Sequence, residues 1–138
     1  MGFDFGVKRL GVAVSDLTRL VATPYCIIER TNLKKDIEQI RKIVEEKQIG
    51  GFVYGLPKQM DGSEGQTAEM VRAFALKVAN QIDLPYVFWD ERLSSKAVEN
   101  VLIGEADMSR KKRKKVLDSS AAAYILQGAL DMMGHTKL

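Results

Sequence analysis

The first position that could carry chemistry is Asp4, which lies between Phe3 and Phe5 in a short apolar run. In a strand, side chains alternate, so the two phenylalanines would occupy one face and Asp4 the other. A carboxylate there is costly to bury unless it is paired or bound to a metal, whereas on a half-exposed sheet it would simply face solvent. Gly2 and Gly6 share the face of Asp4 and would leave room for a ligand.

A second acid, Asp118, stands near the start of a helix predicted over residues 116–133. It heads a stripe of small and apolar residues that would face a sheet, namely Ala121, Ala122, Ile125, Ala129 and Met132. The alanines would let the helix approach the sheet closely, so that Asp118 converges with Asp4. A first-turn acid also stabilises a helix through its dipole, and the two roles can coexist.

A third acidic site, Asp90-Glu91-Arg92, follows a strand predicted over residues 86–89. Ligands of open α/β sheets bind where strands end, so one acid could hold a metal while Arg92 contacts a phosphate oxygen. A surface turn with a local ion pair is the alternative. The residues themselves leave open whether Asp90 or Glu91 would be the ligand.

Three converging carboxylates suit Mg²⁺ or Mn²⁺, which prefer carboxylate and water ligands. A pair of such ions can activate water and stabilise the leaving oxygen of a phosphodiester. The single His and single Cys argue against a zinc site and against a histidine-activated nucleophile.

The charge distribution adds a possible contact with phosphates. The net charge is only +3, but residues 110–115 are six consecutive Lys and Arg residues, and the rest of the chain is slightly acidic. Such a run could neutralise phosphates or form a solvated loop. No apolar run is long enough to span a membrane and no secretory signal is present, so we expect a cytoplasmic protein without membrane contact.

The remaining pattern predicts the elements that position these acids. We expect one α/β domain over residues 1–138, with strands at 2–6, 10–15, 25–29, 52–56 and 86–89. Pro24 would break the chain before the third of these strands. Thr31 or Asn32 would cap a helix that follows the third strand, and Ser63 would cap the next helix. One face of that second helix is marked by Ala68, Val71, Ala75, Val78 and Ile82. A short helix over about 94–103 and the helix at 116–133 complete the order. The predicted sheet is mixed, with three antiparallel strands and then alternating helix and strand.

Four segments combine into a more specific pattern: Asp4–Ala13, Gly55-Leu56-Pro57 with Met60–Ser63, Asp90–Ser95, and Asp118 ahead of Ala121–Ala123. In this order and spacing they resemble the YqgF/RuvX family of Holliday junction resolvases, also described as pre-16S rRNA nucleases. The resemblance covers nearly the whole chain. It implies a ribonuclease H-like fold and an endonuclease that hydrolyses phosphodiester bonds with a divalent metal.

The same resemblance implies that Asp4, Glu91 and Asp118 are the catalytic and metal-binding acids. It places Lys8, Arg92, Ser94, Lys112, Arg113 and Lys115 against nucleic acid. The implied role is processing of the 5′ end of pre-16S rRNA in ribosome biogenesis, so the partner would be structured RNA. The alternative substrate is the four-way DNA junction of recombination and repair. Nothing in the sequence marks a dimer interface, so a monomer and a homodimer are both open.

Two departures and two competing classes qualify this interpretation. The chain begins three residues before Asp4, where members of the family usually carry a few more, so a shortened first strand is expected. Leu117 separates Val116 from Asp118, where relatives often have Lys-Val-Asp, but counting back from Ala121 still selects Asp118. Two other classes of protein compete with the nuclease. The first is a kinase of the actin and sugar-kinase superfamily, which would need a duplicated domain to enclose ATP, whereas 138 residues suffice for one domain.

The second is a non-catalytic RNA-binding protein. Loss of one of the three acids would favour it, and all three are present.

Overall fold

The structure of the protein is a computed structural model, in which residues 1–16, 21–58, 61–90 and 121–132 are described. Its strands are β1 (Gly2–Phe5), β2 (Arg9–Ser15), β3 (Ala22–Glu29), β4 (Phe52–Leu56) and β5 (Tyr86–Asp90). Its helices are α1 (Leu33–Lys47), α2 (Gln66–Gln81) and a helix that includes residues 121–132. The predicted order is therefore confirmed as far as β5. The helix predicted over 94–103 lies outside the described residues.

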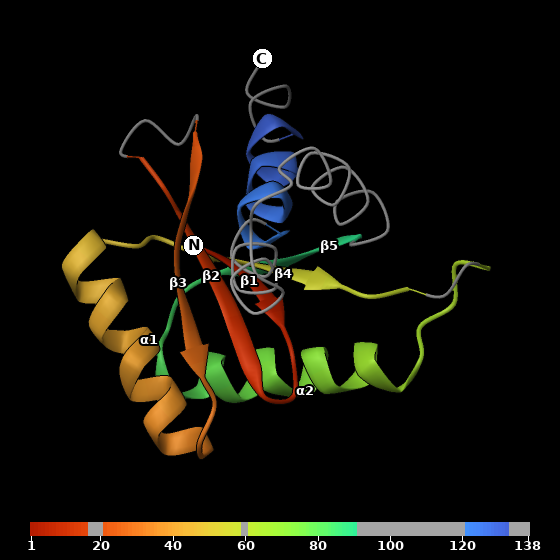
Figure 1. Ribbon diagram of the computed structural model, residues 1–138, viewed down its shortest axis with the longest axis horizontal. Coiled ribbons are helices and arrows are strands. Elements are labelled where there is room, and N and C mark those ends of the chain that lie inside the picture. The colour runs from red at the N-terminus through yellow and green to blue at the C-terminus, as the bar shows by residue number, and fades with distance from the viewer. Residues whose placement is uncertain (17–20, 59–60, 91–120, 133–138) are drawn as a thin grey trace, which may run out of the picture.

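The strands form one mixed sheet in the order β3-β2-β1-β4-β5 (Figure 1). Strand β2 is antiparallel to β1 and β3, whereas β4 is parallel to both β1 and β5. This arrangement confirms the predicted mixed five-stranded sheet. The central strand is β1, so the residues at its C-terminal end lie between two neighbouring strands.

The strand directions bring several chain segments to one edge of the sheet. The C-terminal ends of β1, β4 and β5 lie together because these strands are parallel. The β1–β2 turn lies at the same edge, and so does the end of β3, since Arg9 pairs with Glu29. We call this the carboxyl edge and the opposite one the amino edge.

Strand β3 begins earlier than predicted. Pro24 was expected to interrupt the chain before the strand, but it lies within β3 and pairs with Ala13. Proline is tolerated there because β3 is the edge strand, where one side of the backbone needs no ladder partner. The register shifts beside this position, since Val12 pairs with Cys26 and leaves Tyr25 as the extra residue of a bulge.

Local signals explain the bounds of the helices. Asn32 caps α1, because its side chain accepts a hydrogen bond of 2.9 Å from the N–H of Lys35. The helix ends at Lys47, and the C-cap residue Gln48 adopts the left-handed conformation with φ of 52°. For α2 the prediction was wrong: the N-cap is Gly65, without a side-chain hydrogen bond, and not Ser63. Ser63 instead donates 2.6 Å from its hydroxyl to the carboxylate of Asp61.

The two faces of the sheet bury separate sets of side chains. One face carries Phe3, Leu10, Val12 and Tyr54 and packs against α1 and α2. The predicted stripe of the second helix is confirmed, since its five members are buried, namely Ala68, Val71, Ala75, Val78 and Ile82. The other face carries Ala13 and Val53 and packs against the helix at 121–132. The sheet is thus enclosed between two helical layers, as Figure 1 shows.

The helix at 121–132 meets the sheet nearly as its pattern predicts. Ala121, Ala122, Ile125 and Ala129 are buried as expected. Met132 was expected on the same stripe, but it is 58% exposed, and Leu126 and Leu130 are buried instead. The buried face is therefore centred on Ala122, Leu126 and Ala129, which places Met132 at its margin. In the part of the chain that is described, no helix has the length and apolar character needed to cross a membrane.

Candidate active site at the carboxyl edge

Asp4 lies one residue before the end of β1, on the face covered by the helix at 121–132. Its neighbours Phe3 and Phe5 point to the opposite face, where Phe3 is fully buried and Phe5 contacts the ring of Phe74 on α2. Alternation therefore confirms the predicted face of Asp4. Gly11 is its partner on β2, and Asp4 itself is only partly buried. The carboxylate thus stands at the centre of the sheet near its carboxyl edge.

The glycines around Asp4 have a different purpose from the one predicted. A Cβ added at Gly2 would lie 2.7 Å from Cβ of Leu126 and 3.0 Å from the carbonyl oxygen of Ala122. A Cβ at Gly6 would lie 2.7 Å from the carbonyl oxygen of Arg9. Gly2 therefore makes room for a helix, and Gly6 for the tight β1–β2 turn. The expectation that both leave space for a ligand was wrong.

Glycine also permits close packing further along the same face. A Cβ at Gly55 on β4 would lie 2.5 Å from Cδ1 of Ile125. A Cβ at Gly128 would meet the ring of Trp89 at 2.8 Å. The helix at 121–132 thus lies directly on β1, β4 and β5. Its later turns reach the amino edge, so its first residues lie toward the carboxyl edge (Figure 1).

The side chains of β5 separate the two candidate acids that follow Trp89. Asp90 pairs with Leu56, whose side chain lies in the core on the α1 and α2 face. Tyr86 and Phe88 occupy that same face, as alternation requires. Trp89 occupies the other face, which is the face of Asp4. Asp90 and Asp4 are therefore on opposite faces of the sheet, although both stand at the carboxyl edge.

Lys8 is exposed in the β1–β2 turn at the carboxyl edge, next to Val7, which is 65% exposed. The turn is held by Arg30, a residue that the sequence analysis did not single out. The Arg30 guanidinium donates to the carbonyl oxygen of Gly6 at 3.0 Å and pairs with Asp36 at 3.3 Å. The sequence signal that could have indicated Arg30 is Asp36, an acid three residues after Leu33 on the apolar stripe of α1, because a buried acid needs a charged partner.

The loop between β4 and α2 is held by local hydrogen bonds and an ion pair. The carboxylate of Asp61 accepts 2.9 Å from the N–H of Ser63. Glu64 pairs with Arg72 at 2.6 Å, and this hydrogen bond lowers the pKa of the Glu64 carboxyl. Arg72 also lies over the ring of Phe88 at 4.7 Å. These contacts tie the loop to α2 and β5.

Most of the predicted site residues lie outside the described residues. They are Glu91, Arg92, Ser94, Lys112, Arg113, Lys115 and Asp118. Among the residues that are described, no three His, Cys, Asp or Glu side chains gather as a metal site would require. The described part of the predicted site therefore consists of Asp4 and Lys8.

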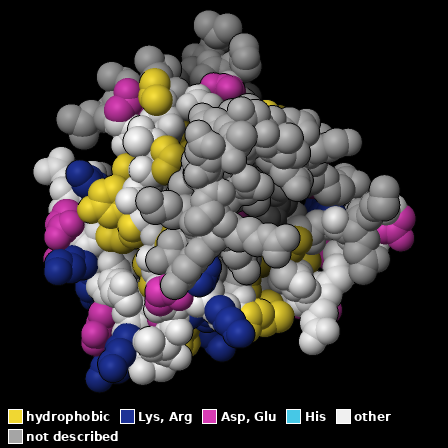
Figure 2. Space-filling model, in the orientation of Figure 1, with side chains coloured by type: hydrophobic (Ala, Val, Ile, Leu, Met, Phe, Trp, Pro, Cys, Tyr) yellow, Lys and Arg dark blue, Asp and Glu magenta, His cyan; other side chains and the backbone are white. Residues whose placement is uncertain are grey.

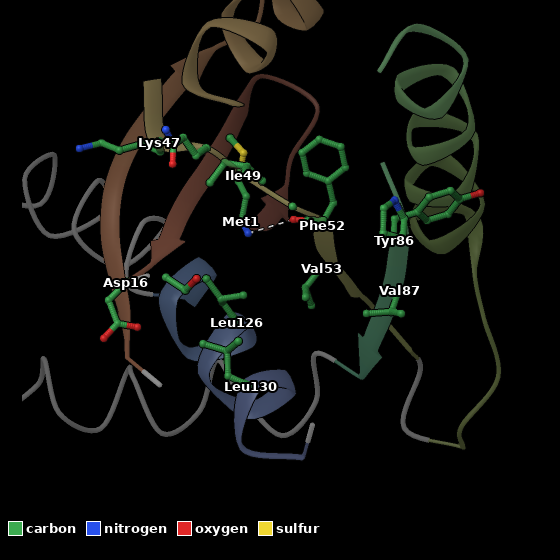
Figure 3. Close-up of a pocket in the computed structure, with 15 residues that line it drawn as sticks. Met1, Asp16, Lys47, Ile49, Phe52, Val53, Tyr86, Val87, Leu126 and Leu130 are labelled. Carbon is green, nitrogen blue, oxygen red and sulfur yellow. Dashed lines mark hydrogen bonds between the residues drawn. The ribbon is translucent and has the colours of Figure 1, made fainter. Parts of the chain in front are cut away.

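A cavity of about 330 Å³ lies at the amino edge, away from Asp4. Figure 3 shows Met1, Phe52 and Val53 on one side of it and Leu126 and Leu130 on the other. Its lining is largely apolar, with Asp16 and Lys47 at its margin. The carboxylate of Asp16 accepts a hydrogen bond of 3.3 Å from the N–H of Val21. Among the described residues that line this cavity, Asp16 is the single acid, so the cavity is not the candidate active site.

Comparison with known proteins decides the family. Residues 1–132 match the family model described as "RuvX: Holliday junction resolvase". The chain belongs to the RuvX family. A relative from Rhodobacter capsulatus, named "Putative pre-16S rRNA nuclease", is 51% identical over 97% of this chain and 84% of its own length. A relative of the same name from Paramagnetospirillum magneticum is 49% identical over 95% of this chain and 84% of its own length.

Solved structures confirm the fold. Thermus thermophilus RuvC in complex with a Holliday junction substrate aligns with a TM-score of 0.60 over 96% of this chain and 94% of RuvC, at 14% identity. Fowlpox virus resolvase in complex with Holliday junction DNA aligns with a TM-score of 0.53 over 96% of each chain, at 11% identity. At these identities the likeness concerns the fold alone. The RuvX chain has the predicted ribonuclease H-like fold and belongs to a family of nucleases.

Proposed function

We propose that this RuvX protein is a metal-dependent endonuclease that hydrolyses phosphodiester bonds in structured RNA, at the 5′ end of pre-16S rRNA in the cytoplasm. The observation that carries the proposal is the position of Asp4, at the centre of the sheet and near the edge where the parallel strands end. Carboxylates at this edge are placed to act on a ligand that approaches the strand ends. The names of the relatives from Rhodobacter capsulatus and Paramagnetospirillum magneticum support RNA as the substrate.

The ligand set that we propose is Asp4, Glu91 and Asp118. Asp4 fits a hard cation because its carboxylate is partly buried on a face otherwise lined by glycines and apolar side chains. Glu91 is favoured over Asp90, because continued strand alternation would place Glu91 on the face of Trp89 and Asp4. Asp118 would lie one turn before Ala121 and Ala122, at the end of the helix that points toward the carboxyl edge.

Bound Mg²⁺ or Mn²⁺ would supply an activated water and stabilisation of the leaving oxygen. The chain's own residues would then orient the substrate. Lys8 is exposed on the β1–β2 turn and can neutralise a phosphate next to the scissile one. Arg92, Ser94, Lys112, Arg113 and Lys115 are proposed to contact the nucleic acid in the same way. The hydroxyl of Ser94 would donate a hydrogen bond, and the cations would add charge.

A second candidate function is resolution of four-way DNA junctions. It is favoured by the description of the matching family and by the junctions named with the RuvC and fowlpox structures. Symmetric cleavage of a junction would require a two-fold dimer, whereas RNA cleavage could be performed by a monomer. The oligomeric state in solution therefore bears directly on the choice.

A cleavage panel tests both functions. Purified protein with Mg²⁺ or Mn²⁺ is offered pre-16S leader RNA, single-stranded RNA and a four-way DNA junction, with Asp118→Asn as the matched inactive variant. We expect site-specific cleavage of the leader RNA that requires the metal and is lost in the variant. Cleavage of the junction alone would select the second function. If the wild-type protein cuts none of these substrates, the enzymatic proposal is wrong.

A further inference from the structure

Arg30 links the β1–β2 turn to both helices on the far face of the sheet. Its side chain is only 19% exposed, and that of its partner Asp36 is 2% exposed. The guanidinium lies 4.8 Å from the centre of the Phe5 ring and 5.1 Å from that of Phe74 on α2. The planar charged group is therefore enclosed by a carboxylate and two aromatic rings, an arrangement that suits Arg and not Lys.

The same residue holds the turn through three hydrogen bonds. The guanidinium donates to the carbonyl oxygen of Gly6 at 3.0 Å and to that of Val7 at 3.5 Å. The backbone N–H of Arg30 donates to the carbonyl oxygen of Lys8 at 2.9 Å. Every residue between β1 and β2 is thus fixed by Arg30. The side chains that project from this fixed turn are Val7 and Lys8, and both are exposed.

Asp36 is held on its other side, so the clamp is anchored in α1. Its second carboxylate oxygen accepts from the N–H of Thr31 at 3.2 Å. Asp36 is the one buried charged residue among those that the structure describes, with 1% of its surface exposed. A buried charge is tolerated only when it is paired and hydrogen-bonded, so the pair specifies a single arrangement of this corner.

We propose that Arg30 is a positioning residue that holds the Val7-Lys8 turn so that Lys8 contacts a phosphate of the nucleic acid beside Asp4. The inference rests on the proposed function, because it needs a nucleic acid at the carboxyl edge. Arg30 itself does not touch the substrate in this account. It acts through Lys8 by removing the freedom of the turn, since a contact made by a pre-organised group loses less entropy on binding.

The test measures binding of a fluorescein-labelled leader RNA by anisotropy, in EDTA, at KCl concentrations from 50 to 200 mM. Lys8→Ala should remove one phosphate contact. Raising KCl across this range should therefore weaken RNA binding by the variant by a factor about threefold smaller than the factor for the wild type. Arg30→Lys keeps the charge but cannot bridge Gly6 and Asp36 together. We expect it to show the same reduced salt dependence as Lys8→Ala, and the double variant to bind no worse than either single variant.

Arg41→Lys is the matched control, because Arg41 on α1 also donates to a backbone carbonyl, that of Gln81 at 2.9 Å, but far from the turn. Its salt dependence should equal that of the wild type. Asp36→Asn provides a second route to the same defect if Arg30→Lys unfolds below the assay temperature, as thermal unfolding would reveal.

The outcomes separate this inference from the proposed function. If Arg30→Lys retains the wild-type salt dependence, then Arg30 does not act through Lys8. The same conclusion follows if the losses of RNA affinity in Arg30→Lys and Lys8→Ala add in the double variant. If the wild-type protein binds neither the leader RNA nor a four-way DNA junction, the proposed function falls and the positioning role falls with it. If the wild-type protein binds the RNA and the effects of Lys8→Ala and Arg30→Lys do not add, both the proposed function and the positioning role of Arg30 are supported.

Discussion

Gly55→Ala is a substitution whose consequence can be worked out from the structure. The added Cβ would lie 2.5 Å from Cδ1 and 3.3 Å from Cγ1 of Ile125. Ile125 is fully buried, so its Cδ1 methyl can move only by displacing its neighbours. Overpacking of this kind lowers the free energy of unfolding by about 1–3 kcal/mol. We therefore expect Gly55→Ala to be destabilised by that amount.

The compensating change is Ile125→Val, which removes the Cδ1 atom that the new methyl group would meet. Alone it should cost about 0.5–1.5 kcal/mol, as such truncations in cores usually do. Combined with Gly55→Ala, it provides the space that the added methyl group needs. The double variant should therefore be more stable than the sum of the two single effects predicts, by at least about 1 kcal/mol.

Urea unfolding followed by tryptophan fluorescence measures all four proteins of this cycle. Trp89 is the single tryptophan of the chain and packs against Gly128 of the same helix, so its emission reports on this interface. If the two effects add to within about 0.5 kcal/mol, the residues do not interact. The helix at 121–132 would then not lie on β4, and the account of the candidate active site would lose its support.

Three further predictions concern individual side chains. Asn32→Ala removes the cap of α1 and should lower the free energy of unfolding by about 1 kcal/mol in urea titrations, whereas Ser63→Ala should change it by less than about 0.5 kcal/mol because Ser63 does not cap α2. The hydroxyl of Tyr54 is buried without a hydrogen-bond partner in the described part of the molecule, and burial, with the nearby Tyr86, raises its pKa. Tyr54→Phe should therefore be neutral or stabilising by up to about 2 kcal/mol, and a loss above about 1 kcal/mol would reveal a partner for the hydroxyl. Burial raises the pKa of the Cys26 thiol, so at pH 8 it should react with iodoacetamide more slowly than glutathione does, and an equal or faster rate would contradict its position in the sheet.

Much of the fold could be predicted because its signals are local. Apolar spacing located α1 and α2, and an acid between two phenylalanines determined the face of Asp4. The helix cap at Asn32 was also readable, since its side chain can reach only nearby backbone groups. The start of β3 was predicted too late because proline ends central strands but is tolerated on an edge strand. The order of strands in the sheet depends on long-range pairing, so no short segment around Pro24 indicates that β3 lies at an edge.

The parts that could not be predicted depend on contacts between distant segments. Gly2 leaves space for Leu126 of a helix that lies far along the chain, so the sequence around Asp4 could not reveal its purpose. The burial of Arg30 and Asp36 likewise depends on the β1–β2 turn and on two aromatic rings from different elements, which the neighbouring sequence does not indicate. Figure 2 shows charged side chains of both signs over α1, whereas Asp36 of the same helix is buried.

The most direct test of the proposed active site compares three carboxyl-to-amide variants in the leader-RNA cleavage assay with saturating Mg²⁺ or Mn²⁺. Asp4→Asn and Glu91→Gln should each lower the cleavage rate at least about 100-fold, because changes even to groups that only support metal ligands often cost that much. Asp90→Asn is the matched control, since Asp90 adjoins Glu91 but faces the other side of the sheet, and it should cleave at nearly the wild-type rate. Loss of cleavage in Asp90→Asn with retention in Asp4→Asn or Glu91→Gln would contradict the proposed site.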